Sequence, residues 1–162
     1  MLLLPDVPLI KVLELLLVLE RRSVWDTRYS VLEDVETYED YKTLYWVVQT
    51  PPGTGNRDFV VDMFYGINKN GVYYLCGKNG THPNKPEVPG LVRGETISTG
   101  MQMYPDKDDP NSTRVNILLQ DDIKGYIPKF LSNAFYAKAP VEWRDTLYKY
   151  YHDVYKHQKS EK

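Results

Sequence analysis

The order of the apolar patterns along this chain predicts an α+β protein built on an antiparallel sheet. A helical pattern comes first, about six strand-like segments follow, and a long helical pattern ends the chain. Most of the strand-like segments follow each other through short turns, which favours antiparallel pairing because parallel strands need long crossovers. The 162 residues suffice for one domain with a single core. We expect one domain over residues 6–157 and a tail over residues 158–162.

The first helix is predicted over residues 7–20. Its apolar side chains recur at spacings of three and four, at Leu9, Val12, Leu13, Leu16 and Leu17. Asp6 is placed to cap this helix, and Pro8 suits the first turn. Charged residues interrupt the apolar run before it reaches the roughly 20 residues of a membrane span. The pattern therefore indicates a buried helix.

Strands are predicted where apolar and polar residues alternate between turn residues. They cover residues 29–37, 41–49, 57–65, 72–77, 91–104 and 113–121. A polar loop over residues 78–90 carries three prolines. The last helix is predicted over residues 128–157, and Pro140 is expected to bend or break it near Ala139 because proline removes a helical hydrogen bond.

The composition narrows the class of function. Lys and Arg number 20 and Asp and Glu number 22, so bulk positive charge for nucleic-acid binding is missing. Cys76 is the only cysteine in the sequence, which excludes an internal disulfide and favours a reducing, cytoplasmic compartment. The 14 tyrosines suit a core, or an apolar cavity with a few polar points.

Two groups of residues resemble parts of sites for phosphate or metal binding, but neither has the full set of residues that such a site needs. Residues 51–55 resemble the start of a phosphate-binding loop, but Asn56 and Arg57 stand where that loop needs Lys and then Ser or Thr. His82, His152 and His157 form no cluster with metal-ligand spacing. We expect a turn at residues 51–55, and a protein that is not an enzyme and uses no metal or cofactor.

Four segments, in chain order, resemble signatures of the START lipid-transfer family. They are RSVWD at residues 22–26, NRDFV at 56–60, PGLVR at 89–93 with a later glycine at Gly100, and DIKGYIPK at 122–129. The resemblance implies a helix-grip fold, in which a curved antiparallel sheet wraps around a long C-terminal helix and encloses a lipid tunnel. It also implies a protein that carries one lipid between membranes and touches their surfaces transiently.

The resemblance also points to a departure from the family. START domains usually carry another helix and about three strands ahead of the segment that starts here. The N-terminal part of the domain is therefore expected to be missing, which leaves the strand at residues 113–121 with an open edge.

One face of the third strand is the predicted tunnel wall. Strand alternation places Arg57, Phe59, Val61, Met63 and Tyr65 on the same side, and the resemblance turns that side inward. An apolar wall with one guanidinium suits a lipid phosphate, because arginine can donate two parallel hydrogen bonds to it. The alternative is that the arginine pairs with a carboxylate and holds the fold.

The resemblance favours a glycerophospholipid as ligand. Sterol-binding members tend to carry a second arginine six residues after the first, and that position here is Met63. Asn56 and residues 91–100 look more like the phosphatidylcholine-transfer subgroup. Aromatic rings surround choline in such members through cation–π contacts. The candidates for that role are Trp46, Tyr65, Tyr73 and Tyr74, with core packing as the alternative. A sterol is the second choice of ligand.

The C-terminal helix is the lid in this reading. Phe130 and Ala134 are its candidate ligand-binding residues, and Ile127 and Phe130 with nearby lysines are candidates for membrane contact. Two alternatives to lipid transfer remain. One is a truncated domain that senses lipid or binds a protein partner, and the other is an enzyme of the same broad fold.

Overall fold

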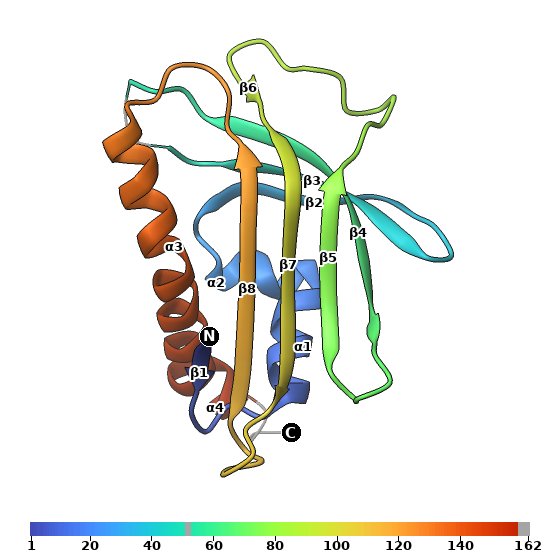
Figure 1. Cartoon of the computed structure of the whole chain (residues 1–162), viewed down its shortest axis with the longest axis vertical. Coiled ribbons are helices and arrows are strands. Elements are labelled where there is room, and N and C mark those ends of the chain that lie inside the picture. Colours follow the sequence, from blue (N-terminus) through green and yellow to red (C-terminus); the bar gives the residue numbers. More distant parts are fainter. Residues whose placement is uncertain (51–52, 159–162) are drawn as a thin grey trace.

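The computed structural model describes residues 1–50 and 53–158 and shows an eight-stranded sheet with helices along its inner side (Figure 1). Neighbouring strands follow the order β1-β8-β7-β5-β4-β3-β2, and β6 pairs with β4 off this path. Every pairing is antiparallel except the short one between β4 and β6. The α+β class and the helix-grip arrangement are therefore confirmed.

The elements have the following bounds: β1 Leu2–Leu4, α1 Leu9–Leu17, α2 Leu19–Trp25, β2 Tyr29–Thr37, β3 Tyr41–Val48, β4 Arg57–Ile67, β5 Tyr73–Asn79, β6 Val92–Arg93, β7 Glu95–Pro105, β8 Thr113–Asp122, α3 Lys129–Tyr150, a π-helical turn Tyr151–Tyr155 and α4 Lys156–Gln158. Pro51 and Pro52 of the expected turn, and residues 159–162 of the expected tail, lie outside the described residues.

The N-terminal segment differs from the single helix expected there. Val18 is extended, with φ −88° and ψ 102°, so the helical stretch divides into α1 and α2. Asp6 does not cap α1, because the N-cap residue is Pro8. The backbone N–H of Asp6 instead donates to Ser112 Oγ at 3.0 Å. Ahead of it, β1 pairs with the start of β8, and Leu4 there is fully buried. Local periodicity cannot reveal this strand because its partner is more than 100 residues away.

The strand expected over residues 91–104 is divided at Gly94. Before it, β6 pairs with β4, and after it, β7 pairs with β5 and β8. The Gly94 N–H donates to the Asp58 carbonyl at 2.9 Å, and a Cβ at Gly94 would lie 2.3 Å from the Phe59 ring. A glycine is required here because the chain passes directly over that ring.

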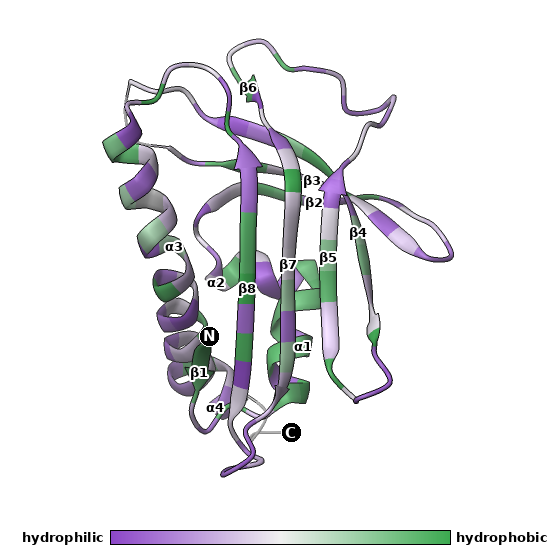
Figure 2. Ribbon diagram, in the orientation of Figure 1, coloured by the Kyte–Doolittle hydropathy of each residue, from purple (hydrophilic) through white to green (hydrophobic). Residues whose placement is uncertain are grey.

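The core lies between the sheet and the helices. Val12, Leu15 and Leu16 of α1 are buried against Trp25 and Trp143, whose rings meet edge to face with centroids 6.1 Å apart. Figure 2 shows α1 mostly hydrophobic along its length, whereas α3 alternates between hydrophobic and hydrophilic residues. The alternation is expected for a helix with one covered face.

Helix α3 continues through Pro140 to Tyr150. The expected break near Ala139 is not found, and the helical pattern changes only at the π-helical turn Tyr151–Tyr155. The buried residues on either side of Pro140, Ala139 and Trp143, help to hold the segment helical despite the local cost of proline, because tertiary packing overrides intrinsic propensity.

One edge of the sheet is only partly covered. β1 pairs with Thr113–Val115 alone. In the part of the chain that the structure describes, no strand pairs with Asn116–Asp122 on that edge.

Candidate functional site

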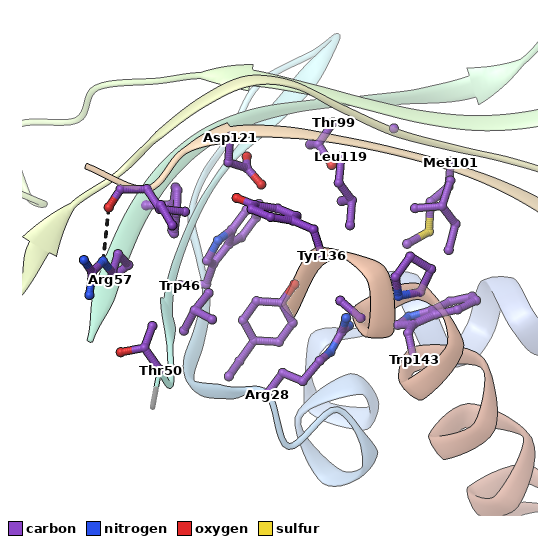
Figure 3. Close-up of a pocket in the computed structure, with 18 of the residues that line it drawn as sticks. Arg28, Trp46, Thr50, Arg57, Thr99, Met101, Leu119, Asp121, Tyr136 and Trp143 are labelled. Carbon is purple, nitrogen blue, oxygen red and sulfur yellow. Dashed lines mark hydrogen bonds between the residues drawn. The ribbon is translucent and has the colours of Figure 1, made fainter. Parts of the chain in front are cut away.

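A largely apolar cavity lies between the inner face of the sheet, the helices α1 and α2, and α3 (Figure 3). The space not filled by protein atoms is about 1290 Å³, which includes the part open to solvent. The sheet contributes Trp46, Phe59, Met63, Met101, Ile117 and Leu119, and α3 contributes Leu131, Tyr136 and Trp143. A ligand site of this kind, apolar with a few polar groups, is typical of cavities for small apolar molecules.

Four of the residues predicted from sequence line this cavity: Trp46, Arg57, Phe59 and Met63. Val61, on the same face of β4, is fully buried but packs against Gly77 and is not part of the lining. A Val61 methyl group occupies the space above Gly77, since a Cβ at Gly77 would lie 2.8 Å from it.

Tyr65 and Tyr73 lie elsewhere, in a smaller hollow that also involves Leu13 and Leu17. Leu16 of the same helix lines the main cavity. Helix α1 therefore covers the inner face of the sheet at this level and separates the far end of β4 from the cavity.

The two residues predicted on the lid helix point outward. Phe130 is 71% exposed and Ala134 is also exposed, and neither belongs to the lining. Leu131, Ser132 and Tyr136 line the cavity from the same part of α3. The orientation of α3 about its own axis decides which residues face inward, and periodicity alone leaves that rotation open.

The guanidinium of Arg57 is engaged by backbone carbonyls from two loops. Nε donates to the Ile123 carbonyl and Nη2 to the Lys124 carbonyl, both at 3.1 Å. Nη1 donates to the carbonyls of Thr54 and Gly55. Four of the five N–H groups of arginine are therefore used. Burial lowers the pKa of Arg57. Backbone carbonyls stand where the alternative interpretation placed a carboxylate partner.

The other cavity arginines, Arg22 and Arg28, are also engaged. Both pair with the buried Asp26: Arg28 Nε reaches Oδ1 at 2.7 Å, and Arg22 Nε reaches Oδ2 at 3.2 Å. Burial favours a higher pKa for the Asp26 carboxyl, but the hydrogen bonds and charges of the two arginines outweigh it and lower that pKa. The positive charge around the cavity is thus largely satisfied within the protein.

A carboxylate on β8 stands on the opposite wall. Asp121 lines the cavity and, among the described residues, has no ion-pair partner. Burial raises the pKa of Asp121. Burial, followed by the charges of Asp121 and Asp122, raises the pKa of Tyr136 on α3 to about 12. The Tyr136 hydroxyl therefore stays protonated at neutral pH, and Figure 3 shows its ring beside Asp121.

Sequence reasoning missed Arg28, Asp121, Tyr136 and Trp143 as cavity residues. Two signals were present. Ile117, Leu119 and Asp121 alternate on one face of β8, and the lining residues of α3 recur at helical spacing, at Ser132, Tyr136, Ala139 and Trp143.

No group of His, Cys, Asp and Glu within residues 1–50 and 53–158 has a metal-binding arrangement. No described helix is long and apolar enough to cross a bilayer.

The sheet, the long C-terminal helix and the apolar cavity between them define a helix-grip domain with an internal ligand space. The model of the START domain matches residues 1–151 of the chain. The chain belongs to the START domain family, which consists of lipid-binding domains.

Curated relatives share parts of this sequence. The steroidogenic acute regulatory protein of Danio rerio is 37% identical over 93 residues, which cover 57% of this chain and 32% of the relative. The StAR-related lipid transfer protein 5 of Mus musculus is 28% identical over 132 residues, which cover 79% and 62% of the two chains. The matched segment thus spans about a third of the length of the first relatives.

Solved structures share the fold. Human StAR-related lipid transfer protein 5 superposes with a TM-score of 0.80 at 20% identity, over 89% of this chain and 70% of that chain. Human STARD10 superposes with a TM-score of 0.80 at 24% identity, over 98% and 66%.

Proposed function

We propose that this protein binds a single lipid in the cavity beneath α3 and carries it between membranes, without catalysing a reaction. The observation that supports this most directly is the apolar cavity of a START member, closed by α3 and lined mainly by aliphatic and aromatic side chains. Such a cavity removes apolar ligand surface from water, which is the main driving force for holding a lipid.

The β8–α3 loop and the start of α3 are the proposed membrane contact. Tyr126 is 87% exposed and Phe130 is 71% exposed, whereas Ile127 between them lines the cavity. Lys129 is exposed beside them, and Lys124 pairs with Glu95. Exposed rings next to a lysine suit a membrane surface, where aromatic side chains lie at headgroup level. Movement of this segment would open the cavity, which fits a cytoplasmic protein that visits membranes.

The first candidate ligand is a glycerophospholipid. Its support is the resemblance of Asn56 and residues 91–100 to the phosphatidylcholine-transfer subgroup, together with the Trp46 ring in the lining. A headgroup role for Arg57 has less support, since four of its N–H groups already bind carbonyls. A cationic headgroup would instead find the carboxylate of Asp121.

A sterol is the second candidate, and Asp121 favours it. A carboxylate without a basic partner, next to a protonated tyrosine hydroxyl, suits a ligand that ends in a hydroxyl group. The relatives that share part of this sequence include the steroidogenic acute regulatory protein, whose name refers to the formation of steroids.

Mass spectrometry tests the proposal. The purified chain is examined under native conditions and its organic extract is analysed, and the delipidated chain is then mixed with donor and acceptor vesicles. We expect one lipid per chain and transfer that depends on protein concentration. A chain that carries no lipid and takes up none from phosphatidylcholine or cholesterol vesicles contradicts lipid binding. A chain that binds lipid but moves none between vesicles indicates a lipid sensor or a protein-interaction domain.

A further inference from the structure

The indole N–H of Trp143 is a buried hydrogen-bond donor without an acceptor. Trp143 lies on α3, is 1% exposed and lines the cavity. Its Nε1 atom has no hydrogen-bond partner within the described part of the chain. Buried tryptophan N–H groups usually have a partner, because leaving one unmade costs free energy. A molecule bound in the cavity that Trp143 lines can supply this missing acceptor.

The neighbouring Trp25 shows how such a group is normally satisfied. It is 2% exposed, and its Nε1 donates to the Leu15 carbonyl at 3.0 Å. The two indole rings contact each other edge to face. They share an environment, but only the ring that borders the cavity lacks an acceptor.

Most side chains that line the cavity carry no oxygen atom. Leu16, Ile117 and Met101 are lining residues without a side-chain oxygen, and Figure 3 shows Met101 on the same side of the cavity as Trp143. An apolar part of a ligand would fill this space but leave the N–H unpaired. A ligand oxygen in this place would satisfy it.

We propose that the Trp143 N–H donates a hydrogen bond to an oxygen of the bound lipid and so sets how the lipid lies in the cavity. This inference rests on the proposed lipid binding. The acceptor is a hydroxyl oxygen or an ester carbonyl oxygen, which a sterol or a glycerophospholipid would respectively supply. Because Trp143 is part of α3, the bond also ties the proposed lid helix to the bound lipid.

Matched ligand pairs test this bond. Cholesterol is compared with cholest-5-ene, which has the same ring system and no hydroxyl, and a diester phosphatidylcholine is compared with its diether analogue, which has no carbonyl. We expect Trp143→Phe to weaken binding of the oxygen-bearing member by about fivefold, the effect of one hydrogen bond. Binding of the other member should change by less than about twofold. The affected pair identifies the source of the oxygen.

Indole NMR gives a second readout, using the chain labelled with ¹⁵N-tryptophan and assigned with single Trp→Phe variants. On loading with the favoured ligand, the Trp143 N–H signal should shift and its exchange with solvent should slow. The Trp25 signal should stay in place, because that N–H is already bonded. Trp25→Phe serves as the matched control: it should lower the melting temperature and weaken both members of each pair equally.

Three results would overturn the inference. In the first, Trp143→Phe weakens both members of each pair equally, so that the indole contributes only packing. In the second, the Trp143 signal is already slow to exchange in the delipidated chain and unchanged on loading, so that a buried water is the acceptor. Both leave lipid binding intact. In the third, the wild-type chain binds none of the four lipids, and the proposed function fails as well.

Discussion

Arg57 shows how a single side chain can hold two loops together. Its guanidinium bridges the loop before β4 and the loop after β8 through four carbonyl groups. Gly125, at φ 65°, packs so close that a Cβ there would lie 3.3 Å from Arg57 Nη2. The arrangement supports a structural role at the rim of the cavity over a role in binding a phosphate.

The Arg57→Met variant separates the two roles. Methionine keeps much of the length but leaves several buried carbonyls without donors, so we expect a loss of roughly 3 kcal/mol in the free energy of unfolding. For a domain of this size the melting temperature should fall by roughly 6–12 °C. The molecules that remain folded should transfer phospholipid normally. Calorimetry and a vesicle transfer assay provide the two measurements.

The opposite result for Arg57→Met would support a role of Arg57 in binding a lipid phosphate. It consists of an unchanged melting temperature with transfer reduced tenfold or more per folded molecule. Arg93→Met is the matched control, since Arg93 pairs with Asp58 on the other face of β4 and does not line the cavity.

At the level of elements, the proposed lid helix α3 contains a proline, Pro140, in its interior. Residues 129–139 carry the inward-facing Leu131 and Tyr136, and Pro140 follows them within the helix. Proline has no N–H to donate to the carbonyl four residues earlier, so the first part of α3 has weaker support from the second. We expect residues 129–139 to open more readily than residues 141–150.

Pro140→Ala should slow lipid exchange. Alanine restores the N–H donor and can stabilise the helix by up to about 3 kcal/mol. We expect slower amide hydrogen exchange over residues 129–139 and a lower rate of transfer between vesicles, with the equilibrium affinity within about twofold of wild type. Lys138→Ala, at an exposed position of the same helix, is the control and should leave both rates unchanged. Faster transfer in Pro140→Ala would show that the proline does not assist opening.

For the whole molecule, filling the cavity with a ligand is expected to raise the free energy of unfolding. An apolar space of this kind within a 162-residue domain removes contacts that the core would otherwise make. A lipid that binds the folded state alone restores such contacts and stabilises it by about 2.7 kcal/mol at a free concentration one hundred times its Kd.

The delipidated chain should therefore melt roughly 5–10 °C below the loaded chain. Differential scanning calorimetry, before and after incubation with vesicles of the lipid that co-purifies, measures the difference. Vesicles of a lipid that the chain does not bind provide the control. Equal melting temperatures for the empty and loaded chains would contradict a lipid held inside the fold.

The sequence by itself determined the order and approximate bounds of the strands, the antiparallel sheet, the long last helix and the family. These depend on local alternation and on short turns, which the chain carries within each segment, as at Thr113–Asp122. The same alternation identified Arg57, Phe59 and Met63 as residues of one face, and all three line the cavity.

Only the tertiary structure decided what covers each part of that face and what each polar group contacts. Tyr65 shares the face with Met63, yet α1 separates it from the cavity. The carbonyls of Ile123 and Lys124 reach Arg57 from more than 60 positions along the chain. The unpaired indole of Trp143 depends on the rotation of α3 against the sheet. Such contacts join distant segments, so no local pattern encodes them.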